Sequence, residues 1–208
     1  MDITYLGAGS VKLSGKNITV VCDPYTEEAG LGKLNVKADV VTLSTMEGLA
    51  SSAAAMVIDG PGEYEVKGAM ITGVPAQLHI DEDGTRATVY GIMIDGINVV
   101  VTGNIAGKLG NEQTEALGNV DVLVVPVGGT GLTLDAAGAA AVVTQLEPSY
   151  VVPVHYGDGK TKYAMPQDGV ELFLKEMGAS PEPEPKLKLS GREETGETQV
   201  VVLKRSGE

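Results

Sequence analysis

The chain has 208 residues, of which 43% are hydrophobic and 21% are charged, and its formal net charge at pH 7 is −13. This length and apolar content suffice for one globular domain with a substantial core. The charge argues against a nucleic-acid partner or an anionic membrane, because binding to phosphate needs Lys and Arg and the chain has only 15 of them.

Cysteine and histidine are scarce, which limits metal chemistry. The single cysteine, Cys22, excludes a disulfide within the chain and a Cys-based zinc cage, and His79 and His155 alone cannot build a histidine-rich centre. The first residues lack the basic and apolar segments of a signal peptide, and no apolar run approaches the roughly 18 residues that span a bilayer. We therefore expect a cytoplasmic protein with no membrane partner.

The first half is predicted to be mainly β-structure. Alternating and β-branched runs predict strands at 3–6, 10–13 and 18–22, and Asp23–Pro24 stops the last of these. After the Gly-rich segment 25–37, the apolar run 38–44 is typical of a strand that is covered on both faces. Further on, residues 56–75 read as strand, and residues 78–84 read as a hairpin tip that would place His79 on the surface.

The second half alternates strands and helices. Strands are predicted at 91–94, 99–104, 120–127 and 150–155, and helices at 111–117, 133–146 and 169–177. After a Pro/Glu linker at 180–185, we expect a C-terminal hairpin within 186–204. This order predicts a single domain over 1–208 with an α/β or α+β layered sandwich.

A repeat of the first half is visible in the second. When the two halves are aligned so that Gly15 and Asn17 match Gly96 and Asn98, the same alignment places Asp23 opposite Asn104. After a shift of one further residue, residues 38–40 match residues 120–122. Two pseudo-repeated halves, about 1–90 and 91–180, are one interpretation. The alternative is a coincidence between two hairpins with glycine turns.

Polar residues follow the predicted buried strands. Because ligands in layered α/β folds bind at the carboxyl ends of strands, we expect these residues to converge on one edge. They are Asp23, Ser44–Thr45, Asn104, Gly128–Gly129 and His155. His155 is either a ligand or general acid–base residue, or a histidine that hydrogen-bonds a neighbouring loop.

Two glycine-containing segments have open interpretations. In residues 60–66, Glu63 and Tyr64 could point into the cleft, or the glycines could shape a turn before an ordinary strand. The segment 128–131 resembles an anion-binding loop, but it lacks the Lys-Ser/Thr that follows in a P-loop.

The chain resembles the metallo-β-lactamase fold, and within it the predicted metal-dependent hydrolases that include ascorbate-phosphate lactonase-like proteins. Matching segments lie in order along nearly the whole chain, at 3–7, 22–24, 38–44, 60–68, 120–129 and 147–156. The resemblance implies a four-layer αββα sandwich made of two ββα-type halves, which agrees with the repeat.

The resemblance also implies metal ligands at positions that are changed here. In the family, a His-x-His-x-Asp-His loop follows the strand that ends at Ser44. The seven ligand positions hold Thr45, Glu47, Leu49, Ala50, Val101, Asn104 and His155, so that six of them have changed. Ala8 stands where the family often has another His.

Catalytic zinc typically takes three protein ligands, mostly His. We therefore expect no metal cofactor; a remodelled single divalent site at Asp23, Glu47 and His155 is the alternative.

Three functions follow from these patterns. The first is a metal-free, non-catalytic member of the fold that binds an unidentified small molecule or protein. The second is a hydrolase of a phosphoester or lactone that uses a remodelled site around His155. The third is a homo-oligomeric structural subunit, which the low aromatic content of 4% disfavours.

Overall fold

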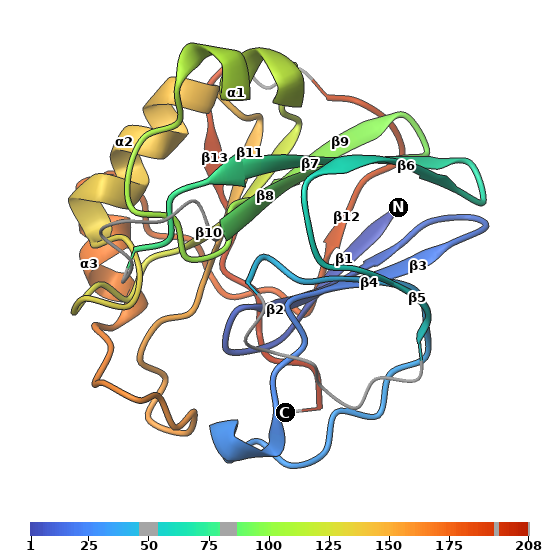
Figure 1. The fold of residues 1–208 in the computed structure, drawn as a ribbon. Helices are drawn as coiled ribbons and strands as arrows, with labels where there is room; N and C mark the ends of the chain where they lie inside the picture. The colour runs from blue at the N-terminus through green and yellow to red at the C-terminus, as the bar shows by residue number, and fades with distance from the viewer. Residues whose placement is uncertain (46–53, 80–86, 194–195, 208) are drawn as a thin grey trace.

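The computed structural model describes residues 1–45, 54–79, 87–193 and 196–207, and it shows two mixed β-sheets packed face to face (Figure 1). The first sheet has the strand order β12-β1-β2-β3-β4-β5. Its strands are β1 (Asp2–Gly7), β2 (Ser10–Ser14), β3 (Thr19–Cys22), β4 (Ala38–Thr42), β5 (Ala54–Ile58) and β12 (Leu187–Lys188).

The second sheet has the order β13-β11-β10-β9-β8-β7-β6. Its strands are β6 (Gly62–Val66), β7 (Ala69–Ala76), β8 (Ala87–Ile94), β9 (Ile97–Val101), β10 (Val122–Pro126), β11 (Tyr150–Val154) and β13 (Gln199–Val200). Every residue of β9 and of β10 is buried, as expected for strands covered on both faces.

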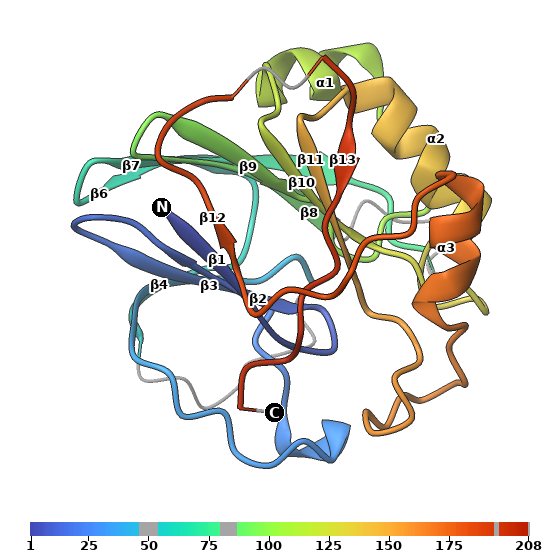
Figure 2. The ribbon, with the colours of Figure 1, turned by 180° about the vertical axis from the view of Figure 1, so that it is seen from behind.

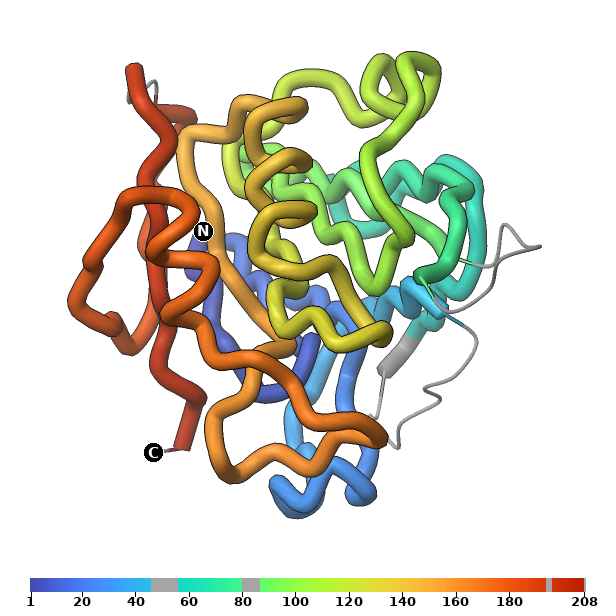
Figure 3. The backbone as a smooth tube through the Cα atoms, turned by 90° about the vertical axis from the view of Figure 1, so that its left-hand side faces the viewer, coloured from blue at the N-terminus to red at the C-terminus, as the bar shows by residue number. Residues whose placement is uncertain are grey.

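The outer layers of the two sheets differ. Helices α1 (Asn111–Leu117), α2 (Ala136–Leu146) and α3 (Val170–Glu176) cover the second sheet (Figures 1 and 2), and α2 and α3 face the viewer in Figure 3. On the first sheet, a small apolar cluster is covered by Tyr25, Leu34 and Val36, from the segment that contains the 3₁₀ turn η1 (Glu27–Ala29). The predicted αββα-type sandwich is confirmed. The outer layer on the first sheet consists largely of irregular chain. None of the described helices is long and apolar enough to cross a membrane.

A buried tyrosine ties the sheets together. Tyr90 on β8 is 1% exposed, and its hydroxyl lies 3.0 Å from the carbonyl oxygen of Leu43, directly after β4, and 3.2 Å from that of Ile58 in β5. The backbone N–H of Thr88 donates to the carbonyl of Ser44 beside it at 2.8 Å. These bonds fix how the ends of β4 and β8 approach one another.

The two sheets share one pairing pattern. In β1 to β5, as in β7 to β11, two antiparallel pairings are followed by two parallel ones. This agrees with the expected repeat, and residue 90, near which the two halves are expected to meet, lies inside β8. The strand register also aligns Cys22 with Val101, so that Asp23 corresponds to Thr102 and not to Asn104.

The expected C-terminal hairpin within 186–204 does not form. β12 pairs antiparallel with β1, whereas β13 pairs parallel with β11 in the other sheet. Both segments have strand-like patterns, but a short apolar pattern does not identify its partner, and each sheet offers a free edge here. The C-terminal chain therefore adds one edge strand to each sheet.

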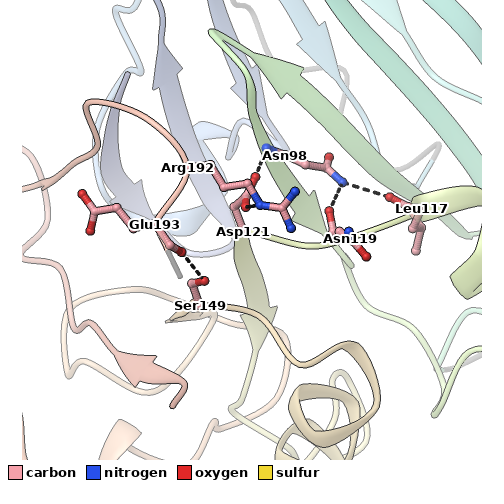
Figure 4. Close-up of polar contacts among 7 residues, drawn as sticks. All are labelled: Asn98, Leu117, Asn119, Asp121, Ser149, Arg192 and Glu193. Carbon is pink, nitrogen blue, oxygen red and sulfur yellow. Dashed lines mark hydrogen bonds and ion pairs between the residues drawn. The ribbon is translucent and has the colours of Figure 1, made fainter. Parts of the chain in front are cut away.

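An aspartate fixes the start of the parallel pair in each sheet. Asp121 precedes β10, and its carboxylate accepts the backbone N–H of Asn98 at 2.7 Å and pairs with Arg192 at 3.1 Å (Figure 4). At the corresponding place, Asp39 accepts the N–H of Thr19 at 2.8 Å. The two aspartates that mark the repeat in the sequence thus fix the register between neighbouring parallel strands.

Replacing the more buried of these two aspartates should cost more stability. Asp121→Ala leaves the buried N–H of Asn98 without its acceptor, and we expect a loss of about 2 kcal/mol in the free energy of unfolding. Asp39→Ala is the matched control and should cost less, because the Asp39 side chain is 28% exposed against 9% for Asp121. Urea denaturation of both variants tests this ranking, and an equal or larger loss for Asp39→Ala contradicts it.

Candidate functional site

The carboxyl ends of the parallel strands in both sheets line one cavity of about 190 Å³. Five of the residues expected at this edge lie in its wall: Asp23 after β3, Ser44 and Thr45 after β4, Asn104 after β9 and His155 after β11. The remaining lining residues are Ala8, Gly9, Pro24, Tyr25, Thr26, Leu43, Val101, Gly103, Val124, Pro126 and Val154.

The other candidates lie elsewhere. Glu63 is exposed on β6, the edge strand of the second sheet, and the Tyr64 hydroxyl donates to the carbonyl of Gly60 at 3.2 Å. Neither residue lines the cavity, and an exposed charge on an edge strand opposes pairing with another chain. Gly129 lines a separate cavity together with His79, which is half-buried and not on the open surface as expected. Glu47 lies outside the described residues.

Gly128 lies behind the cavity wall, where it allows close packing. A Cβ atom on Gly128 would lie 2.4 Å from the backbone oxygen of His155 and 2.5 Å from Oε1 of Gln167. The Gly128 carbonyl accepts the N–H of Asp168 at 2.8 Å, which holds the 167–168 segment against the end of β10. The glycine is therefore needed for the approach of this segment to His155.

Asp23 joins the ends of β3 and β4. Its carboxylate accepts the backbone N–H of Ser44 at 2.6 Å. Burial raises the pKa of Asp23 to about 6, although the hydrogen bonds from Ser44 act in the opposite direction. At neutral pH the cavity therefore carries a carboxylate that is less favourably ionised than an exposed one.

His155 presents a mostly buried imidazole. Its backbone N–H donates to the carbonyl of Ala8 at 2.7 Å, and its ring packs against Tyr163 with 4.6 Å between the ring centroids. Burial lowers the pKa of His155, and interactions of the ring with its own backbone and with the Gln167 side chain act in the other direction. The imidazole is therefore neutral at neutral pH, when one ring nitrogen donates and the other accepts.

The backbone around the cavity is strained. Ala8, Asp23 and His155 have φ angles of 52°, 45° and 52°, which side chains with a Cβ atom rarely adopt. They are three of the seven non-glycine residues with positive φ among those described, and all three line the cavity. Such strain tends to cluster where a site must hold side chains in a fixed arrangement.

Sequence reasoning missed parts of this wall. Tyr25 and Thr26 line the cavity, although their segment reads only as irregular chain. Their position directly after the Asp-Pro that ends β3 is the signal that could have identified them. Tyr163 and Gln167, which contact the imidazole from a loop beyond β11, carry no comparable sequence signal.

The described part of the cavity does not fit a catalytic metal. Among residues 1–45, 54–79, 87–193 and 196–207, no three His, Cys, Asp or Glu side chains are grouped to hold an ion. The cavity wall offers Asp23 and His155, whereas catalytic zinc takes three protein ligands. Thr45 and Asn104 are neutral and Val101 has no donor atom.

Comparisons with known proteins point to one superfamily. Residues 2–155 match the model of the beta-lactamase superfamily domain. A Thermotoga maritima structure, assigned to the Zn-dependent hydrolases of the metallo-β-lactamase superfamily, is 32% identical with a TM-score of 0.80, and the match covers 98% of each chain. UPF0173 metal-dependent hydrolases of Thermococcus onnurineus and Pyrococcus abyssi are 33% and 32% identical over 116 residues, which is 53% of this chain. The match spans about half the length of these curated relatives, 51% of each.

A side chain at position 128 should destabilise the protein. Gly128→Ala forces the new methyl group against the His155 backbone, and we expect a loss of about 1–3 kcal/mol. Gly107→Ala is the control, because nothing lies within 4 Å of its Cβ position, and it should change stability by less than about 0.5 kcal/mol. Thermal unfolding of both variants measures the difference; two equal losses contradict this packing.

The raised pKa of Asp23 predicts a pH-dependent stability. A carboxyl whose folded pKa is raised to about 6 favours the folded state below its unfolded pKa, and this contribution is lost as pH rises through 6. Asp23→Asn removes the titration but keeps an acceptor for Ser44. We therefore expect its stability relative to the parent chain to rise between pH 5 and 7.5, by on the order of 1–2 kcal/mol. Urea denaturation across this range tests the sign, and a constant difference contradicts it.

Proposed function

Because the chain belongs to the metallo-β-lactamase superfamily, we propose that it keeps the cavity of that fold but uses it to bind a small polar molecule without a resident metal. The observation that supports the proposal is the cavity wall, which contains Thr45, Val101 and Asn104. These are three of the positions that the family resemblance assigns to metal ligands. The curated relatives are named metal-dependent hydrolases. This chain would therefore share their fold but act without a bound metal.

The remaining chemistry of the wall supports a binding site. Asp23 and His155 are held by strained backbone and by hydrogen bonds to Ser44 and Ala8, so their positions are fixed before any ligand arrives. A preformed site avoids the entropic cost of ordering side chains on binding. The apolar residues Leu43, Val101 and Val124 complete the wall, in the mixture of apolar surface and few polar groups that ligand sites have.

Charge and size define the class of ligand. Among the described residues, no Lys or Arg lines the cavity, and Asp23 is the carboxylate in its wall. A neutral or cationic molecule that donates hydrogen bonds is therefore favoured over a phosphate ester, which needs cationic partners. The volume of about 190 Å³ is below the roughly 300–1,000 Å³ of common ligand pockets, so the ligand is small or enters only in part.

A panel of probes tests this class. Thermal shift and calorimetric titration at pH 7.5, in EDTA, should show stabilisation by small polyols or primary amines and none by inorganic phosphate. Asn104→Leu should abolish the shift, because it removes polar atoms from the wall, and exposed Glu63→Gln should leave it unchanged. Binding of phosphate alone, or binding that requires a divalent ion, contradicts the proposal.

A second candidate is metal-independent hydrolysis of a lactone. It is favoured by His155, whose lowered pKa leaves an imidazole that can accept a proton from water at neutral pH. Turnover of lactones in EDTA that is lost in His155→Ala would establish it, with phosphodiesters as the comparison substrates. Absence of turnover leaves the binding function as the better account.

We also propose that the protein is cytoplasmic and that the β6 edge is not an assembly surface. Cys22 is fully buried with its pKa raised to about 12 by burial, which suits an unreactive thiol in a cytoplasmic protein. Exposed Glu63 and Glu65 on the β6 edge oppose growth of the second sheet by a further chain. We therefore place the interaction with a ligand in the cavity and not at this edge.

A further inference from the structure

Two buried polar atoms next to the cavity have no assigned hydrogen-bond partner. They are Nδ1 of His155 and Oε1 of Gln167; among the described residues only Ser10 and His79 have similar atoms. Buried polar atoms are almost always paired in native proteins. A protonated Nδ1 is a donor and Oε1 is an acceptor, so each can satisfy the other.

The orientation of the Gln167 amide is fixed by its other contacts. Its Nε2 donates to Oγ1 of Thr130 at 2.8 Å and lies 3.2 Å from the carbonyl oxygens of Met165 and Pro166. The Thr130 hydroxyl donates to the Pro166 carbonyl, so its oxygen is free to accept from the amide. Flipping the amide would place its oxygen against two carbonyl oxygens. The nitrogen therefore stays on this side, and Oε1 faces the other way.

Oε1 faces the imidazole side of the loop. The Cβ position of Gly128 is 2.5 Å from Oε1 of Gln167 and 2.4 Å from the backbone oxygen of His155, so both residues meet at this glycine. Burial lowers the pKa of His155, and interactions of the ring with its own backbone and with the Gln167 side chain oppose this shift, as expected when oxygens accept from the ring. The opposite edge of the ring points to the cavity: a Cβ on Gly9, a lining residue, would lie 3.6 Å from Cδ2 of His155.

We propose that Gln167 is a positioning residue that accepts the Nδ1–H of His155, holds the imidazole in this tautomer and thereby presents Nε2 to the cavity as a hydrogen-bond acceptor. The network runs from the Pro166 carbonyl through Thr130 and Gln167 to His155. Its consequence for recognition rests on the proposed function: a ligand that reaches Nε2 must donate a hydrogen bond, as an alcohol or amine does.

Nuclear magnetic resonance of ligand-free protein tests the tautomer directly. The chain has only two histidines, so ¹⁵N- and ¹³C-labelled histidine gives two sets of ring signals, which His155→Gln assigns. At pH 7.5 the wild-type His155 ring should show the Nδ1–H tautomer, with Nε2 unprotonated. Gln167→Met, which keeps the length of the side chain but removes its acceptor, should shift the ring toward the Nε2–H tautomer, with the His79 signals unchanged.

Gln113→Met is the matched control. Gln113 lies in the first turn of α1 and donates to the Pro75 carbonyl, away from His155, so its loss should leave the His155 tautomer unchanged. An Nε2–H tautomer in the wild-type protein overturns the inference, even if Gln167→Met fails to fold. An unchanged Nδ1–H tautomer in folded Gln167→Met also overturns it. The tautomer is measured without a ligand, so this result does not depend on whether any probe binds. Failure of the proposed binding function can therefore be distinguished from failure of the proposed role of Gln167.

Discussion

The site depends on the parallel pairing of strands at the centre of each sheet. Parallel strands that share a register end together, so β3 and β4 in one sheet and β9, β10 and β11 in the other deliver their carboxyl ends to one cavity. A slip by one residue would turn every side chain to the opposite face. The aspartates at positions 39 and 121 hold the other end of these strands, which connects the register at one edge to the chemistry at the opposite edge.

The chain leaves these strands through strained turns that set the polar groups. Asp23 turns back to accept the N–H of Ser44, and Gly103 makes room for the Ser44 side chain, since a Cβ there would lie 2.3 Å from the Ser44 hydroxyl oxygen. His155 turns at a positive φ and is held by Ala8. Strand pairing therefore sets the turn geometry, and the turns place the Asp23 carboxylate and the neutral His155 imidazole in the described part of the cavity wall.

The sequence allowed much of the fold and part of this site to be predicted. Apolar runs identified the central strands, and the repeated Asp at the start of β4 and just before β10 identified equivalent positions. The strand ends identified Asp23, Thr45, Asn104 and His155. The pairing of β12 and β13 could not be predicted, because two-residue strands carry no partner information. The contact of Gln167 with His155 depends on how a loop folds back across Gly128, which no local pattern encodes.

The central claim is that the cavity binds its ligand through protein groups, without a resident metal ion. The most direct test is the metal content of protein purified from a culture supplemented with zinc, manganese and iron, measured by mass spectrometry alongside the melting temperature with and without EDTA. The account predicts well under one equivalent of any of these metals and a melting temperature that EDTA does not change. One equivalent of a bound ion that stabilises the protein and is lost in Asp23→Asn or His155→Ala would contradict it.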